Sequence, residues 1–353
     1  MPNRFVTPLI VVLALVASAP PARAAVTLRS LLLDDGGPRP GWFERYQDSR
    51  QGPETVDKTS QTFKVGAAAA LDLTGIAGDV RVTGGGGNEI RVEATKRVRH
   101  RSAGEARRLL TELRVEMNNF NGRVEVRTVH PRRTSGERNI SARVDYVVAV
   151  PAGASVAIRS ISGDVVVSSV RGEVRAETVS GDISVEGSPN LAMAKTVSGD
   201  VVARDSGSTA TLVLGTVSGT VIASGLKARA LEAGSVSGDV RLSGMQLERV
   251  AAKSVSGSIE FDGPLVKAGR YEFTSHSGNV RIVIAGNTGF ELDADTFSGS
   301  VRSDVPVTLR TMGYDDRDRR RGASNRAIRG SYGDASAILS IRSHSGSVVI
   351  AKK

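Results

Sequence analysis

The dominant pattern along this chain is an alternation of apolar and polar residues on both sides of a recurring Ser-Gly pair. Counting back from each Ser, the sixth and fourth positions are apolar or aromatic and the second is always Ser or Thr. Counting forward, the third position is always Val or Ile. Alternation with a period of two is typical of a strand with one buried face, and Ser-Gly is typical of a tight corner. Each copy therefore predicts a strand, a turn and a second strand.

The Ser-Gly pair recurs at nearly constant intervals. It begins at Ser162, Ser180, Ser198, Ser218, Ser237, Ser256, Ser277 and Ser298, and a last copy begins at Ser345. The steps are 18, 18, 20, 19, 19, 21 and 21 residues, followed by one of 47. A period of about 20 residues predicts a solenoid, because coils stacked ~4.8 Å apart bury together what one coil cannot bury alone. We therefore predict an all-β fold, a parallel β-solenoid (β-helix) of about nine coils within a repeat domain spanning residues 151–353.

Residues 63–150 follow a different pattern. Apolar residues alternate around Gly78-Asp79, as in an early relative of the repeat. Ser102 and Glu105 form a capping box before apolar residues at helical spacing, which predicts a short helix. Asn121-Gly122 lies between two alternating segments and predicts a β-hairpin. Because this block does not fit the repeat, we interpret it as an N-terminal α+β capping region that covers the open end of the solenoid.

The first residues predict export. Residues 1–24 combine Arg4, an apolar run over residues 9–16 and a small-residue cleavage site ending at Ala24, which is typical of a signal peptide. The run is shorter than the ~20 apolar residues that a membrane span needs. Residues 25–62 contain several Gly and Pro breakers and are predicted to be a linker. We expect an extracytoplasmic protein without a transmembrane span after signal removal, either periplasmic or secreted, with attachment to the cell surface left open.

Composition narrows the chemistry. Aromatic residues make up only 4% of the chain and Gly contributes 39 residues, which favours narrow coils filled by Val, Ala, Leu and Ile. The absence of Cys excludes disulfides, thiolate catalysis and Cys-ligated metals. The net charge of +10 falls to about +8 (10 − 2) without Arg4 and Arg23. Two interpretations of this charge remain open, namely contact with an anionic envelope surface and solubility alone.

A basic segment accounts for the long last interval. We predict that residues 310–335 form a polar loop inserted in the repeat domain. It is either a tolerated insertion or a partner-binding loop, since long loops on rigid scaffolds often carry function. The candidate partner-binding residues are Arg317, Arg319, Arg320, Arg321, Arg326 and Arg329. Guanidinium groups bind carboxylates and phosphates, so the partner classes that fit are an anionic envelope polymer, a lipid or another envelope protein. No nucleic-acid partner is expected.

Several segments together carry a family resemblance. They are Ala149–Val156 leading into Ile161–Val165, Gly269–Glu272 leading into Ser275–Gly278, and Gly333–Ala337 leading to Ser345–Val348. Over about residues 60–353 the chain resembles a bacterial family of adhesin-like β-strand-repeat proteins, a DUF-type β-solenoid family of unknown function. The resemblance implies a secreted or envelope-associated solenoid, and it offers no catalytic residues to carry over.

Two columns of side chains are candidates for metal binding. Asp164, Asp182 and Asp200 follow the turn on consecutive coils, where stacked carboxylates would suit Ca²⁺. The column continues mainly as Ser, Thr and Asn, which favours hydrogen bonds to backbone amides instead. His276 and His344 share a repeat position with Phe297. With Phe297 on the coil between them, the histidines would lie ~10 Å apart, too far to share a metal. We therefore expect an aromatic column, no metal and no cofactor.

The alternative to a binding module is an enzyme. A carbohydrate-active β-helix enzyme, of the polysaccharide lyase or hydrolase type, would need paired carboxylates or an Asp beside a Lys. Asp293 with Asp295, or Asp262 with Lys267, are the pairs that fit this role. The acidic residues are scattered, however, and no nucleophile–base pair is recognisable. We predict a non-enzymatic, adhesin-like structural or binding module of the bacterial cell envelope, with no catalytic residues.

Overall fold

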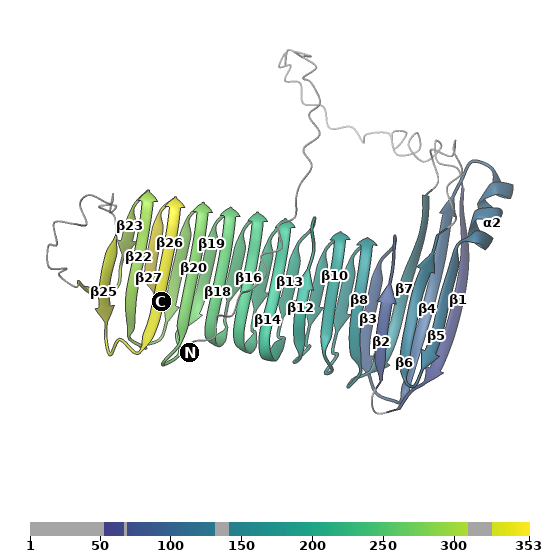
Figure 1. Ribbon diagram of the computed structural model, residues 1–353, viewed down its shortest axis with the longest axis horizontal. Coiled ribbons are helices and arrows are strands. Elements are labelled where there is room, and N and C mark those ends of the chain that lie inside the picture. Colours follow the sequence, from purple (N-terminus) through teal and green to yellow (C-terminus); the bar gives the residue numbers. More distant parts are fainter. Residues whose placement is uncertain (1–52, 67–68, 131–140, 310–326) are drawn as a thin grey trace, which may run out of the picture. The chain divides into compact units, whose positions relative to one another are not determined.

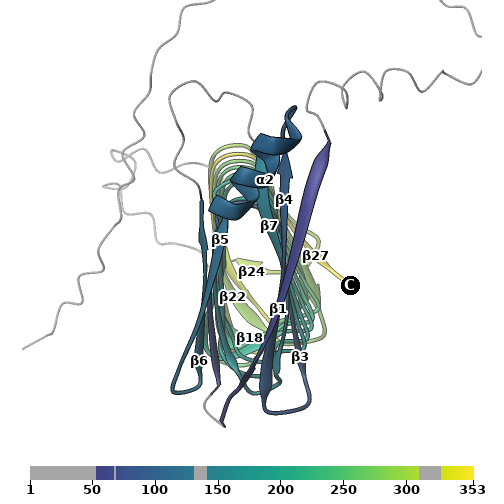
Figure 2. The same ribbon diagram turned by 90° about the vertical axis from the view of Figure 1, so that its right-hand side faces the viewer.

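A computed structural model describes residues 53–66, 69–130, 141–309 and 327–353, which all lie in one compact unit, Tyr46–Lys353. In this part the chain is all-β apart from one short helix. Two sheets of 13 and 14 strands, here called sheet A and sheet B, form opposite walls around a buried apolar core (Figures 1 and 2). The predicted fold class, a solenoid-like stack of parallel β-strands, is confirmed at this level.

From β8 to β23, the strands alternate between sheet B and sheet A. The N-terminal ones are β1 (Glu54–Lys64), β2 (Ala70–Thr74), β3 (Val80–Gly85), β4 (Glu89–Arg99), α2 (Ala103–Glu112), β5 (Arg114–Phe120), β6 (Arg123–Val129) and β7 (Ser141–Pro151). The repeat strands of sheet B are β8 (Ser155–Ser162), β10 (Val174–Ser180), β12 (Leu191–Lys195), β14 (Gly207–Ser218), β16 (Lys227–Ser237), β18 (Gln246–Ser256), β20 (Arg270–Ser277), β22 (Phe290–Ser298) and β26 (Ala337–Ser345). Those of sheet A are β9 (Val165–Ser168), β11 (Ile183–Glu186), β13 (Val201–Arg204), β15 (Val221–Ser224), β17 (Val240–Ser243), β19 (Ile259–Pro264), β21 (Val280–Ala285), β23 (Val301–Ser303) and β27 (Val348–Lys352).

Equivalent repeat positions pair with each other across neighbouring strands. Leu212, Leu231 and Val250 are register partners on β14, β16 and β18, and all three are buried. The predicted alternation is therefore observed in these coils. One position departs from it: on β12, Leu191 is buried where the spacing places Ala192, because the register shifts between Val174 and Arg175 on the neighbouring β10. The register shift absorbs the extra residue, and Ala194 is again the register partner of Ala176.

The Ser-Gly corner joins neighbouring coils through up to three kinds of contact, shown here for the coils around Gly199. The hydroxyl of Thr216 donates to the carbonyl of Gly199 on the preceding coil (2.9 Å), and the amide of Gly199 donates to the carbonyl of Ser218 (2.9 Å). The carboxylate of Asp182 accepts from the amide of Asp200 (2.8 Å). Equivalent carboxylate–amide bonds form wherever the coil carries an Asp at this position: Asp164 N to Asp79, Asp182 N to Asp164, Thr220 N to Asp200, and Ser258 N to Asp239. The aspartates thus bond the amide of the next coil rather than that of their own turn.

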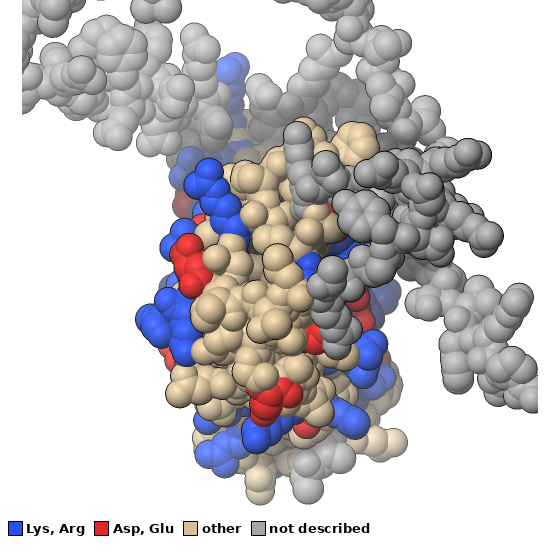
Figure 3. All heavy atoms as spheres, turned by 90° about the vertical axis from the view of Figure 1, so that its left-hand side faces the viewer, with Lys and Arg blue, Asp and Glu red and all other residues tan. Residues whose placement is uncertain are grey.

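The last repeat in the sequence is not the last coil in space. β26 lies between β20 and β22, and β27 lies between β21 and β23 (Figure 1). β22 is followed in sheet B by the antiparallel strands β25 (Ile328–Tyr332) and β24 (Thr308–Leu309). At this end of the stack, charged side chains gather along the sides while the middle is largely uncharged (Figure 3).

In the N-terminal region, the structure differs from two predictions, the extent of the linker and the extent of the block that does not stack. Residues 54–62 were predicted to be linker, but they belong to β1, which pairs antiparallel with β4 along its full length. The segment around Gly78 was placed in the block that does not stack, yet β2 pairs in parallel with β8 and β3 with β9, as in the repeats. The predicted helix and hairpin are confirmed. Ser102 caps α2 by accepting from Glu105 N, and β5 and β6 meet at Asn121-Gly122 with positive φ.

The predicted 310–335 loop is only partly described. Its C-terminal end contains β25, which pairs antiparallel with β22, so this end is a strand rather than loop. Residues 310–326 lie outside the described residues, as do 1–52, which hold the predicted signal peptide and most of the predicted linker. Within the described part, no helix has the length and hydropathy needed to cross a membrane.

Replacing the corner glycine should destabilise the stack. Gly199 has φ 137°, and a Cβ there would collide with the carbonyl oxygen of Gly181. We expect Gly199→Ala to lower the free energy of unfolding by about 2–3 kcal/mol, measured by urea denaturation. Gly215→Ala is the matched control, because its Cβ would meet only ordinary contacts with Lys195 and Gly234. An equal loss of unfolding free energy in both variants would show that the close approach of Gly199 to the Gly181 carbonyl does not limit stability.

Chelation should leave stability unchanged. The carboxylates of Asp164, Asp182 and Asp200 already accept amide hydrogen bonds from the next coil, so no cation is needed to hold the column. We expect the same melting temperature with EDTA and with millimolar Ca²⁺. A calcium-dependent rise that Asp182→Asn abolishes would contradict this, since a ligand that binds only the folded state raises the melting temperature.

Candidate functional site

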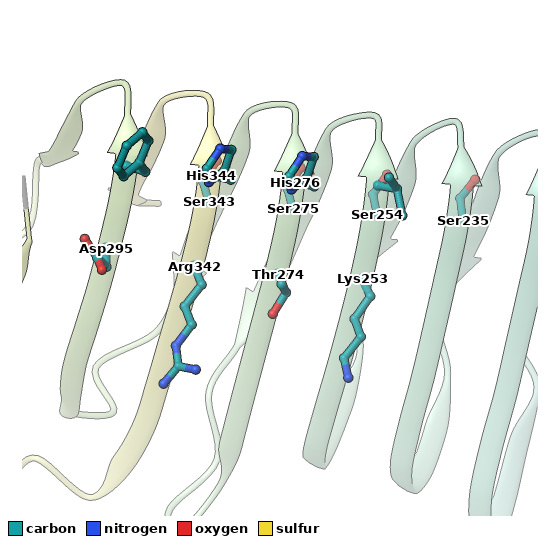
Figure 4. A pocket seen from close by; sticks show the side chains of 12 residues that line it. Ser235, Lys253, Ser254, Thr274, Ser275, His276, Asp295, Arg342, Ser343 and His344 are labelled. Carbon is teal, nitrogen blue, oxygen red and sulfur yellow. The ribbon is translucent and has the colours of Figure 1, made fainter. Parts of the chain in front are cut away.

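The outer face of sheet B is hollowed near the Ser-Gly corner. A depression of about 590 Å³ crosses five neighbouring strands, from β16 to β22 (Figure 4). Its outward side chains come from two repeat positions, one and three residues before the Ser. They are Val255, His276, His344 and Phe297 in the first row, and Lys253, Thr274, Arg342 and Asp295 in the second. Since the strands are hydrogen-bonded in register, both rows are held at the spacing of the strands.

Three aromatic rings form a ladder along the first row. The ring centroids of Phe297 and His344 are 4.9 Å apart with planes 1° apart, and those of His344 and His276 are 4.7 Å apart and parallel. The predicted aromatic column is thus present, but its order was wrong. His344, not Phe297, is in the middle, because β26 lies between β20 and β22. The two histidines are therefore on adjacent strands. In the described residues, no group of three or more His, Asp or Glu side chains is arranged to hold a metal.

Charged groups lie beside the ladder. Lys253 and Arg342 point from the second row of the depression, with Thr274 between them (Figure 4). Both cations are exposed, and neither forms an ion pair with a carboxylate of the described part. Asp295 is the register partner of Arg342 on β22. The depression therefore offers flat aromatic edges and faces, two cations available to a ligand and one carboxylate, all on rigid strands.

The ladder continues as an exposed apolar ridge. The residue before the Ser is Val255, Val236, Val217, Val197, Val179 and Ile161 on successive coils, each about half exposed (45–51%). We call this row the valine ridge. The sequence analysis did not single it out, although the signal was visible: an apolar residue recurs at a position that the alternation assigns to the outside. Single exposed apolar residues are ordinary, but a continuous row is not.

Of the predicted partner-binding residues, the described part of the chain contains Arg329. Arg317, Arg319, Arg320, Arg321 and Arg326 lie outside the described residues, whereas Arg329 on β25 forms an ion pair with Asp293 (2.9 Å). Members of both residue pairs considered for catalysis form ion pairs with other residues. Asp262 is paired with Lys353 (3.1 Å), and Lys267 with Asp334 (3.9 Å). The structure therefore does not bring Asp262 and Lys267 together as an acid–base pair.

The shifted pKa values belong to groups that stabilise the fold. Burial raises the pKa of Tyr146 to about 12, although its hydroxyl is hydrogen-bonded to Thr128 (2.7 Å). Burial also raises the pKa of Tyr271, whose hydroxyl accepts from Val266 N and donates to Leu247 O. Both phenols lie inside the stack and bind neighbouring strands or turns. They do not line the depression.

Comparisons with known proteins identify the repeat region. Residues 174–351 match the family model described as Toastrack DUF4097. No curated protein matches the chain. Among solved structures, a candidate cell adhesion protein from Clostridium sporogenes is 10% identical, covering 85% of this chain and all of the other, with a TM-score of 0.21. Candidate adhesins from Bacteroides fragilis and Parabacteroides merdae are each 11% identical, with TM-scores of 0.39 and 0.30. They cover 83% and 64% of this chain, and 97% and 88% of their own chains. With half of its length matched by that model, the chain belongs to the Toastrack DUF4097 family.

Proposed function

We propose that this protein is a non-catalytic, extracytoplasmic binding module of the bacterial cell envelope that holds an anionic polysaccharide on the outer face of sheet B. The observation that carries the proposal is the aromatic ladder of Phe297, His344 and His276 in a depression beside two cations that form no ion pair with a described carboxylate. The extracytoplasmic location follows from the signal peptide predicted in residues 1–24.

The chemistry of the depression suits a charged glycan. Because the three rings are stacked face to face, the C–H groups of a sugar chain running along them pack against the exposed ring edges, which contributes dispersion and removes apolar surface from water. Lys253 and Arg342 lie where they can bind carboxylate or phosphate groups on the same polymer. The depression crosses five strands at ~4.8 Å spacing, about 19 Å in all, so it accommodates a linear chain running along the stack.

In the same proposal the solenoid is a scaffold of about nine repeat coils with a closed N-terminal end. β1, β4 and β5 pair antiparallel with their neighbours, and α2 contacts β1 and β4. Antiparallel pairing ends the parallel ladder, and charged residues such as Lys58 and Lys64 lie on the edge strand β1. Such features discourage a further chain from adding to the edge.

The enzymatic alternative has no comparable support. Hydrolysis by paired carboxylates needs two groups that converge on one bond. Asp293, one member of the first candidate pair, forms an ion pair with Arg329, and the members of the second pair bind other partners. Binding without turnover is the function that we infer.

Removing the Phe297 ring from the aromatic ladder should weaken glycan binding selectively. We expect Phe297→Ala to reduce affinity for an anionic glycan about tenfold, because an aromatic contact contributes about 0.5–1.5 kcal/mol beyond its buried area. Binding is measured by co-sedimentation with polygalacturonate and with wall teichoic acid. Phe120→Ala is the matched control, since Phe120 is 62% exposed and Phe297 is 65% exposed, but Phe120 ends β5 in the N-terminal hairpin. Unchanged binding by Phe297→Ala, or an equal loss in Phe120→Ala, would refute the proposal.

A further inference from the structure

A second depression lies on the same sheet, at the other end of the strands. It has a volume of about 740 Å³ and is lined by residues from β14, β16, β18 and β20 and from the turn before β20. Arg270 and His276 are six residues apart on β20, which places this depression ~20 Å from the aromatic ladder. The two depressions share no lining residue. We call the second one the arginine hollow.

Three arginines surround the arginine hollow. Arg249 on β18 and Arg270 on β20 are direct register partners on adjacent parallel strands, and both side chains are exposed. The third, Arg229 on β16, forms an exposed ion pair with Glu248 (3.5 Å). On the strand before Arg249 the register position is Ala230, and on the strand before that it is Thr211. These small side chains leave the floor of the hollow open.

Arg249 and Arg270 have no counterion within the described part of the chain. Neither forms an ion pair with any carboxylate there. Glu248 also lines the hollow, but it is paired with Arg229, and Glu232 on β16 and Glu272 on β20 lie two positions further along their strands than Ala230 and Arg270. Within the described residues, none of these three glutamates forms an ion pair with Arg249 or Arg270. Like charges directly opposite each other on neighbouring strands cost stability. The stability of the fold therefore does not explain this arrangement.

Two adjacent guanidiniums over an open floor match an oxyanion. Each guanidinium presents a planar fork of N–H donors that pairs with two oxygens of a carboxylate or phosphate. At the ~4.8 Å spacing of neighbouring strands, one oxyanion can accept from both forks. Thr211 adds a hydroxyl to the lining of the same hollow. Binding an anion also removes the repulsion between Arg249 and Arg270.

We propose that the arginine hollow is a second binding site, which takes an oxyanion group, a phosphate or a carboxylate, through Arg249 and Arg270. The site uses other residues than the aromatic ladder and does not depend on the function proposed above. The outer face of sheet B would then have two separate binding sites, one that combines aromatic rings with cations and one that binds through paired arginines.

The test uses two small probes in physiological salt, inorganic pyrophosphate and citrate, with binding followed by calorimetry and by the Arg Nε–Hε resonances. We expect saturable binding of at least one probe by the full chain, and the stronger probe identifies the group. Arg249→Gln/Arg270→Gln should weaken binding at least tenfold. Arg249→Lys/Arg270→Lys should give intermediate affinity, because charge remains while the fork is lost.

Two control variants test whether binding is due to this site rather than to the overall positive charge or to the aromatic ladder. Arg81→Gln/Arg281→Gln removes the same charge from exposed positions on sheet A and should bind as the wild type does. Phe297→Ala should also retain pyrophosphate or citrate binding. A loss of glycan binding at the aromatic ladder can therefore be told apart from a loss of anion binding in the arginine hollow. The inference is overturned if neither probe binds, if the glutamine double variant or the lysine double variant binds like wild type, or if the sheet A control loses as much affinity.

Discussion

The structure depends on the close approach of backbone to backbone at the Ser-Gly corner. Each corner glycine lies against the carbonyl of the preceding corner glycine, and a hydroxyl two residues before the Ser donates to that carbonyl in most coils. A carboxylate or amide oxygen after the glycine holds the next amide. Because these three contacts repeat, the corner tolerates little change. The varying step of 18 to 21 residues is absorbed at the opposite corner, where the connections between sheet A and sheet B differ in length.

Identical corners also make coils interchangeable, and this explains the order of the last coils. β26 presents the same inward positions as β20 and β22, so Leu339 pairs with Tyr271 on one side and Leu292 on the other. Nothing in the stacking rule requires neighbours in space to be neighbours in sequence. Because β26 lies in the interior, β22 pairs on its other side with the antiparallel β25, and the parallel strand pairing of sheet B ends there. The same placement sets His344 between His276 and Phe297 and so assembles the ladder.

The division between inward and outward positions separates stability from binding. Inward positions are mostly occupied by apolar side chains that fill a narrow core, with a column of Ser and Thr hydroxyls beside the Ser-Gly corner and a few further buried hydroxyls, such as that of Tyr271. Outward positions carry no such restriction, and there the coils differ: valine on most coils becomes His or Phe near the C-terminal end. Chemistry can therefore vary on the outer face of sheet B at little cost to the stack. The aromatic ladder and the arginine hollow are two such variations on a common scaffold.

The repeat sequence by itself determined the parallel solenoid, its inward residues and the aromatic column, because a period-two alternation locked to a glycine corner permits one register. Local signals at Ser102 and Asn121-Gly122 likewise determined the helix and the hairpin. Only the tertiary structure decided which coils are neighbours, and hence that His344 contacts His276 and that Arg249 faces Arg270. It also decided that β1 begins at Glu54 and that Arg329 pairs with Asp293. These contacts depend on which strand occupies each edge, and equivalent repeats carry no local signal for that choice.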